Sequence, residues 1–153
     1  MLILQMWLVC QALALDPQAS SYLRRDFTVE EGLPDNEVNA ITQTRNGFLW
    51  VGTDGGLARF DGEHFTQIRL RAGKRKEIPI SFLLTAEDGA LWVGTDSGLA
   101  HIPSAALDHF DRSLVTMYHQ GAGPSDRIAC LLIRNGILWV GTSHGLYRFD
   151  RGN

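Results

Sequence analysis

Short runs rich in apolar residues recur at three places along this chain, and each run precedes a two-residue turn signal. The runs cover 38–43, 80–85 and 128–133, and the turns are Asn46-Gly47, Asp88-Gly89 and Asn135-Gly136. Asn-Gly and Asp-Gly accept the positive φ angles of a two-residue hairpin turn, whose twist matches that of the flanking strands. The pattern therefore predicts three β-hairpins, each with a two-residue turn.

The second strand of each predicted hairpin carries the same motif. Leu-Trp-Val-Gly-Thr, followed by a further turn and Gly-Leu, occurs at 49–57, 91–99 and 138–146. Tryptophan is a large apolar plate suited to packing between stacked sheets, and glycine within a strand marks close approach by another backbone or side chain. These structural positions are Trp50, Gly52, Trp92, Gly94, Trp139 and Gly141. Further strands are expected at 57–60, 65–68, 99–102, 114–118 and 146–149.

Four short strands per unit, repeated at this interval, are typical of the blades of a β-propeller. A continuous β-sandwich, the main alternative, has turn signals without a long-period repeat. The predicted fold is all-β: about three four-stranded antiparallel propeller blades that form an incomplete ring. A leading outermost strand is expected at 22–29. The blades are expected at 38–68, 80–118 and 128–149, the last without its fourth strand.

Three blades are too few for a closed propeller, which typically has 4–8. The expected partners are therefore the remaining blades of a longer protein, which we favour, or further copies of the chain. The connection at 103–110 is longer than its counterpart in the first unit and is expected to form one helical turn.

The N-terminal segment is predicted to be an export signal. Residues 2–15 are almost wholly apolar, but they are too few to span a bilayer comfortably as a helix. Ala12-Leu13-Ala14 has the small-x-small form of a signal-peptidase site, although no Lys or Arg precedes the apolar run. We expect a signal peptide at 1–14, a propeller region at 22–153 and a periplasmic location. An uncleaved N-terminal anchor is the alternative.

Composition and charge narrow the classes of function. The 153 residues carry a net charge of −3, which disfavours nucleic-acid binding. Two cysteines exclude a disulfide scaffold and a multi-cysteine zinc site, and the five histidines share no metal-ligand spacing. A nucleophile elbow and a phosphate loop are both missing from the sequence. We therefore predict no catalytic residue, no metal and no cofactor.

The candidate ligand site is inferred from topology alone. In a propeller, the loops that enter the innermost strands and the turns between the second and third strands converge on one face around the axis. The polar residues expected there suit a hydroxylated ligand, and they are Asp35, Asn36, Asp54, Arg75, Lys76, Asp96, Asp126, Arg127 and His144. For the basic residues at 69–76, an ordinary solvated loop is the alternative, and turn aspartates commonly bond their own backbone.

Residues 32–41 and 46–62 closely resemble the two-component regulator propeller repeat, with Gly-Leu-Pro-x-Asn-x-Val followed by Asn-Gly-x-Leu-Trp-Val-Gly-Thr-x-x-Gly-Leu. The resemblance extends over 27–150. It implies the periplasmic sensor part of a bacterial membrane protein, which in the family precedes a transmembrane helix and a histidine kinase, diguanylate cyclase or DNA-binding domain. Relatives detect environmental signals, often oligosaccharides.

The resemblance therefore implies a non-catalytic extracytoplasmic ligand-sensing module of a two-component signal transduction regulator. Its expected partner is an extracellular small molecule or an oligosaccharide. A membrane would be reached only through a missing C-terminal region or an uncleaved N-terminus. Kinase and cyclase motifs do not occur in the sequence. The alternatives are part of a propeller enzyme, such as a lyase or hydrolase with its catalytic residues on other blades, and a structural protein-interaction scaffold.

Overall fold

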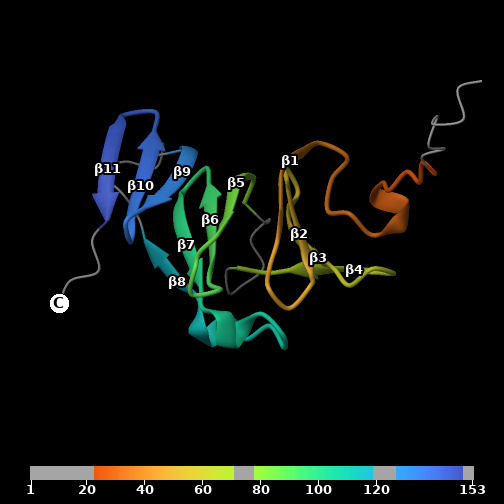
Figure 1. The fold of residues 1–153 in the computed structure, drawn as a ribbon. Helices are drawn as coiled ribbons and strands as arrows, with labels where there is room; N and C mark the ends of the chain where they lie inside the picture. Colours follow the sequence, from red (N-terminus) through yellow and green to blue (C-terminus); the bar gives the residue numbers. More distant parts are fainter. Residues whose placement is uncertain (1–22, 71–77, 119–126, 150–153) are drawn as a thin grey trace, which may run out of the picture.

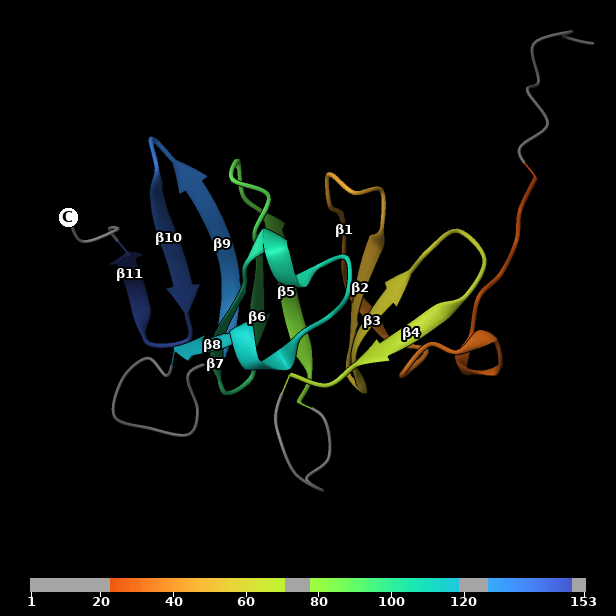
Figure 2. The ribbon, with the colours of Figure 1, turned by 90° about the horizontal axis from the view of Figure 1, so that it is seen from below.

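Three antiparallel β-sheets follow one another along the chain (Figures 1 and 2). The structure is a computed structural model, and it describes residues 23–70, 78–118 and 127–149. The predicted signal peptide at 1–14 and the site candidates Arg75, Lys76 and Asp126 lie outside these residues. Among the described residues, no helix is long and apolar enough to cross a membrane.

Each sheet is built from consecutive strands that are hydrogen-bonded in chain order. Sheet 1 contains β1 (Val38–Gln43), β2 (Leu49–Thr53), β3 (Gly56–Phe60) and β4 (Phe65–Ile68). Sheet 2 contains β5 (Ile80–Thr85), β6 (Leu91–Thr95), β7 (Gly98–Ile102) and β8 (Thr116–Tyr118). Sheet 3 contains β9 (Ile128–Arg134), β10 (Ile137–Thr142) and β11 (Gly145–Phe149). The predicted fold class is confirmed.

Only one of the three predicted hairpin turns has two residues. Asn135 and Gly136, between β9 and β10, have φ angles of 51° and 73°. The turns after β1 and β5 are longer, because Thr44 and Ala86 hydrogen-bond to Phe48 and Ala90 beyond the last strand pairs. In these two turns only the glycine has a positive φ. The prediction of a two-residue turn was therefore wrong for them.

The strand predicted at 22–29 does not form over its described part. Residues 23–28 have no strand partner, and Val29–Glu31 form a short 3₁₀ helix, η1, that begins with a capping box at Thr28. A β-strand exists only within a hydrogen-bonded ladder. Instead, Phe27 packs its ring edge-to-face against Phe60 at 5.2 Å and Phe65 at 5.4 Å between centroids.

The connection between β7 and β8 contains two 3₁₀ helices, η2 (Ser104–Ala106) and η3 (Arg112–Leu114). The expected helical turn within 103–110 is thus present as η2. Because η3 occupies Leu114, β8 is shorter than the strand predicted at 114–118. Ala106 and its neighbour Leu107 are buried with Trp50 in the core between sheets 1 and 2.

Neighbouring sheets pack through one repeated contact. A Cβ atom added to Gly52 of sheet 1 would lie 2.5 Å from Cγ2 of Ile80 in sheet 2. One added to Gly94 would lie 2.7 Å from Cγ2 of Ile128 in sheet 3. Each isoleucine is fully buried. A larger residue at either glycine would push the sheets apart, so the strand glycine sets the spacing between sheets.

Carboxylates at turns bond the local backbone, as expected for turn aspartates. Asp61, between β3 and β4, accepts hydrogen bonds from the backbone N–H groups of Glu63 at 2.9 Å and His64 at 2.7 Å. The bond from His64 is the main reason why the pKa of Asp61 lies below its ordinary value. Asp88 accepts from the N–H of Ala90. These carboxylates have a structural use that needs no ligand.

Candidate functional site

The residues proposed from topology lie along one edge of the three sheets, where β1, β5 and β9 begin and β2, β6 and β10 end. Asp54, Asp96 and His144 occupy the turns after β2, β6 and β10, respectively. The backbone N–H groups of Asp54 and Asp96 bond to Glu37 and Pro79, in the segments that enter β1 and β5. We call this edge the loop edge.

Side chains along the loop edge bond mainly to one another and to nearby backbone. Asn39 donates to Asp54 at 2.7 Å, and the guanidinium of Arg127 lies 3.3 Å from the carboxylate of Asp96 across sheets 2 and 3. Asp35 accepts from the N–H of Glu37, and Asn36 accepts from the N–H of Val29. His144 contacts Ser143 in the same turn. The loop edge is therefore polar, but most of its named side chains already hold the loops in place.

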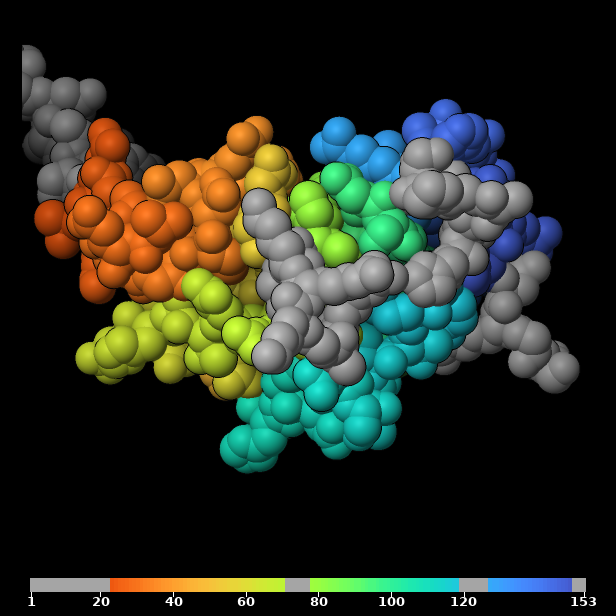
Figure 3. Space-filling model, turned by 180° about the vertical axis from the view of Figure 1, so that it is seen from behind, coloured from red at the N-terminus to blue at the C-terminus, as the bar shows by residue number. Residues whose placement is uncertain are grey.

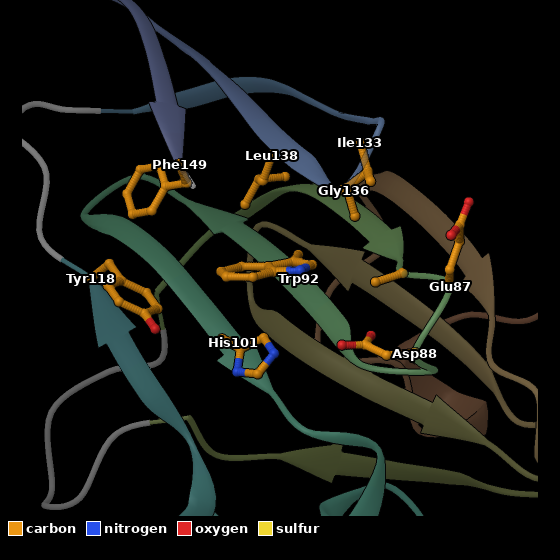
Figure 4. Close-up of a pocket in the computed structure, with 10 residues that line it drawn as sticks. Glu87, Asp88, Trp92, His101, Tyr118, Ile133, Gly136, Leu138 and Phe149 are labelled. Carbon is orange, nitrogen blue, oxygen red and sulfur yellow. The ribbon is translucent and has the colours of Figure 1, made fainter. Parts of the chain in front are cut away.

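A cleft of about 700 Å³ lies between sheets 2 and 3, near the turns that end β5 and β9 (Figure 4). The Trp92 ring occupies its middle, with His101 and Tyr118 on sheet 2 and Leu138 and Phe149 on sheet 3. Its other lining residues are Ala86, Glu87, Asp88, Ile133 and Gly136. Sequence reasoning assigned Trp92 only a structural role and did not find this cleft.

The rings in the cleft contact one another closely. The centroid of Trp92 lies 4.4 Å from that of His101 and 5.9 Å from that of Tyr118. Tyr118 in turn meets Phe149 of sheet 3 edge-to-face at 5.7 Å. These contacts hold the Trp92 indole in place while part of its surface stays accessible. Within the described residues, no hydrogen bond joins the indole N–H of Trp92 to another group.

The corresponding space between sheets 1 and 2 is filled. There, Trp50 is fully buried and donates its indole N–H to the hydroxyl of Thr44 at 3.0 Å. The guanidinium of Arg59 lies 4.2 Å from the centroid of the Phe48 ring, and it donates to the carbonyls of Leu107 and Asp108 at 2.8 and 2.7 Å. This junction leaves no room beside the indole.

Three differences between the repeats accompany the open second junction. Ala86 stands where the first repeat has Thr44, Ala90 replaces Phe48, and His101 replaces Arg59 opposite the tryptophan. The hydroxyl acceptor and the covering ring are therefore both lost. An alignment of the repeats could have indicated the cleft, because both alanines are smaller than the residues they replace.

The cleft combines aromatic surface with two carboxylates and lacks Lys and Arg among its lining residues. An exposed indole face suits the apolar face of a sugar ring, and carboxylates accept hydrogen bonds from hydroxyl groups. Among the described residues, no three His, Cys, Asp or Glu side chains are grouped so that they could hold a metal ion. The geometry therefore favours binding of a hydroxylated organic molecule.

The repeat motif has a counterpart among known families. The family model described as "Two component regulator propeller" matches residues 32–55. Residues 32–55 are therefore similar to a two-component regulator propeller repeat. The match covers the loop before β1, the first hairpin and the turn after β2, which confirms the resemblance inferred from the motif.

The chain is also similar in sequence to a signalling protein. Over 54 residues the chain is 43% identical to histidine kinase P4 from Formosa agariphila, a stretch that covers 35% of this chain and 4% of that protein. The chain therefore spans a small part of the length of this curated relative.

Two solved structures share the fold. One is the extracellular domain of a protein assigned as a hybrid two-component system from B. thetaiotaomicron. Its TM-score is 0.66 and its sequence identity is 24%; the match covers 83% of this chain and 17% of that chain. The other is virginiamycin B lyase from Staphylococcus aureus, with TM-score 0.51, 18% identity, and 78% and 43% covered. Since one neighbour is an extracellular domain assigned to a two-component system and the other is a lyase, fold alone does not decide function.

Proposed function

We propose that this chain is a non-catalytic ligand-sensing propeller module of a two-component signal transduction regulator. The observation that carries the proposal is the family match at 32–55. The last part of the matched stretch contains Leu-Trp-Val-Gly-Thr, and this motif recurs in sheets 2 and 3. The identity to a histidine kinase supports the same system. In such a regulator the module would bind a cue and pass the signal on through altered packing against its neighbours.

The proposed location is outside the cytoplasm. The extracellular domain that shares the fold supports this location, as does the apolar run followed by Ala12-Leu13-Ala14. We expect a fusion of residues 1–153 to alkaline phosphatase, which folds to an active enzyme only outside the bacterial cytoplasm, to be active in a Gram-negative host. A fusion that lacks residues 1–14 is expected to be inactive. Equal activity of the two fusions would contradict an export signal in this segment.

We place the proposed ligand in the cleft beside Trp92. The indole presents accessible aromatic surface and an available N–H donor, and Glu87 supplies a carboxylate acceptor nearby. Most of the named loop-edge side chains are already engaged in bonds within the chain. The loop edge stays a second proposed contact surface. An oligosaccharide satisfies both the aromatic and the polar parts of the cleft.

The test uses soluble, defined oligosaccharides as probes and tryptophan fluorescence as the readout. We expect at least one oligosaccharide to produce a saturable change in the wild-type chain, and we expect Trp92→Ala to abolish it. Trp139→Ala removes the equivalent residue of the next repeat, outside the cleft, and is expected to keep the binding. Isothermal titration calorimetry would check both variants without an optical signal. Binding that survives Trp92→Ala, or no binding across the panel, would overturn the cleft as the ligand site.

A further inference from the structure

The tripeptide Arg-Asn-Gly occurs twice in the chain, once in the turn between β1 and β2 and once in the turn between β9 and β10. It covers 45–47 and 134–136, and in both places Leu and Trp follow after one further apolar residue. An asparagine before glycine is prone to deamidation, because glycine has no side chain to hinder attack of its own backbone nitrogen on the asparagine amide. The matched sequences give the two asparagines closely similar intrinsic reactivity. A difference between them therefore comes from the fold.

The turn of sheet 1 holds the reacting groups of Asn46 in place. The N–H of Gly47, whose nitrogen would attack, donates to the carbonyl of Thr44 at 2.9 Å. The side-chain amide of Asn46 is bonded at both ends. Its oxygen accepts from the hydroxyl of Thr44, and its nitrogen donates to the carboxylate of Asp108 at 2.8 Å. Ring closure at Asn46 would break these hydrogen bonds, so the fold opposes the reaction there.

A shift of register makes the turn of sheet 3 shorter than that of sheet 1. Leu138 pairs with Ile133, whereas Leu49, at the equivalent position, pairs with Gln43 and not with Thr44. The strand ladder of sheet 3 therefore continues closer to its Asn-Gly pair. Isoleucine also lacks the hydroxyl through which Thr44 bonds the first turn. Both differences lie within single hairpins and do not depend on any neighbouring sheet.

No hydrogen bond holds the peptide group between Asn135 and Gly136. In the part of the chain that the structure describes, its carbonyl, its N–H and the side-chain amide of Asn135 are all without a hydrogen-bond partner. Both residues are exposed. Rotation of this peptide toward the side-chain carbon therefore breaks no hydrogen bond. Asn135 also has a φ of 51°, a left-handed conformation that a residue with a side chain adopts at a cost, so rotation away from it relieves strain.

We propose that Asn135 is a site of spontaneous deamidation in the folded chain, whereas Asn46 is protected. In the first step the backbone nitrogen of Gly136 attacks the Cγ atom of Asn135, and a C–N bond forms between them. The proton of the Gly136 N–H passes through solvent to the side-chain nitrogen, whose bond to Cγ breaks. This nitrogen leaves as ammonia, and a cyclic imide remains.

In the second step water opens the imide. Water adds to one of its two carbonyl carbons, the bond from that carbon to the Gly136 nitrogen breaks, and the nitrogen regains its proton. Opening at the side-chain carbonyl gives aspartate, and opening at the main-chain carbonyl gives isoaspartate. The reaction consumes one water molecule and releases one ammonia molecule, and it needs neither an oxidant nor a reductant.

Both products alter one wall of the cleft between sheets 2 and 3. Ile133 and Gly136, on either side of Asn135 in the hairpin, line that cleft (Figure 4). Aspartate adds a negative charge at the tip of the hairpin. Isoaspartate adds its Cβ atom to the main chain, so the turn no longer has the length that fits the pairing of Ile137 with Arg134. The isoaspartate product therefore loosens this end of the strand ladder.

The test compares the two asparagines in one sample of the wild-type chain, incubated in mildly alkaline buffer. The two sites react independently, because sheets 1 and 3 lie at opposite ends of the row of sheets (Figures 1 and 3). Cleavage after glutamate separates the sites into peptides 38–63 and 88–153, each with one Asn-Gly pair. Mass spectrometry with fragmentation locates the mass gain from replacement of NH2 by OH. Since three hydrogen bonds protect Asn46, we expect conversion at Asn135 to be about tenfold faster or more.

Three controls accompany this comparison. A sample digested without incubation measures the conversion that digestion itself causes. In concentrated urea both turns are lost, so we expect the two asparagines to convert at similar rates. Asn135→Gln places the amide one carbon further from the backbone, which disfavours ring closure, and is expected to remove most of the conversion from peptide 88–153 while conversion at Asn46 stays unchanged. An isoaspartyl methyltransferase with S-adenosylmethionine, which methylates isoaspartate but not aspartate, is expected to label that peptide in the wild type only.

The proposal predicts a difference between the sites that exists only in the folded chain. Equal conversion of Asn46 and Asn135 in the folded chain would overturn it, as would an absence of isoaspartate in peptide 88–153. A difference that persists in urea would also overturn it, because the fold would then not be the cause. No ligand enters these measurements, so their outcome is separate from that of the binding experiment at Trp92.

Discussion

Replacing Trp50 with alanine is expected to lower the free energy of unfolding by about 3–5 kcal/mol, the usual cost of removing a large aromatic side chain from a core. Trp50 is fully buried between sheets 1 and 2, and its indole N–H bonds to the hydroxyl of Thr44, which is itself buried. The variant would leave a cavity and deprive that hydroxyl of its donor. Urea unfolding followed by circular dichroism measures the change.

The control for this prediction is Trp139→Ala, which alters the same motif in sheet 3. Trp139 lies on the outer face of sheet 3 and is only partly buried, so its loss creates no closed cavity. We expect less than half the destabilisation of Trp50→Ala. Equal costs would mean that the two tryptophans have similar surroundings, contrary to the structure.

Replacing Gly52 with alanine is the second change for which we expect a large effect, about 1–3 kcal/mol of destabilisation from overpacking. The new methyl group would lie 2.5 Å from Cγ2 and 2.9 Å from Cβ of Ile80. Both atoms belong to a fully buried side chain close to the backbone, so local rotation cannot relieve the clash. The free energy of unfolding of the variant, again from urea titration, gives the size of the effect.

A double-mutant cycle separates this clash from a backbone effect. Ile80→Ala removes the clashing atoms, so Gly52→Ala is expected to cost much less in that background than in the wild type. Gly141→Ala is the matched single change, because the atom nearest to its new methyl group is the sulfur of Cys130, an exposed side chain that can rotate away. Additive costs for Gly52→Ala and Ile80→Ala would show that the two residues do not share the contact.

The fold could be predicted from the sequence because its signals are local and repeated. The turn glycines and the Leu-Trp-Val-Gly-Thr motif mark each hairpin without reference to the rest of the chain. Residues 23–28 of the strand predicted at 22–29 have no ladder partner among the described residues, and Phe27 packs on a sheet face instead. The expected two-residue turns failed at Asn46 and Asp88 because an Asn-Gly or Asp-Gly pair also fits a longer turn with one positive φ.

The candidate site was harder to predict, for a different reason. Topology alone puts Asp54 and Asp96 at one edge of the sheets, but it does not show that Asn39 and Arg127 already engage them. The cleft beside Trp92 depends on pairs of residues from different sheets. Ala86 and Ala90 line or adjoin it at the positions that the larger Thr44 and Phe48 occupy in the first repeat. Such a space can be recognised only when the repeats are compared position by position within a known packing.

Arg59 makes the first repeat dependent on the second. Its guanidinium meets the carbonyls of Leu107 and Asp108, which come from the long connection between β7 and β8. A duplication or exchange of the first unit during evolution would separate this cation from its acceptors, and both hydrogen bonds would be lost. The first and second units are therefore not interchangeable, because the hydrogen bonds of Arg59 need one residue from the first unit and a connection from the second.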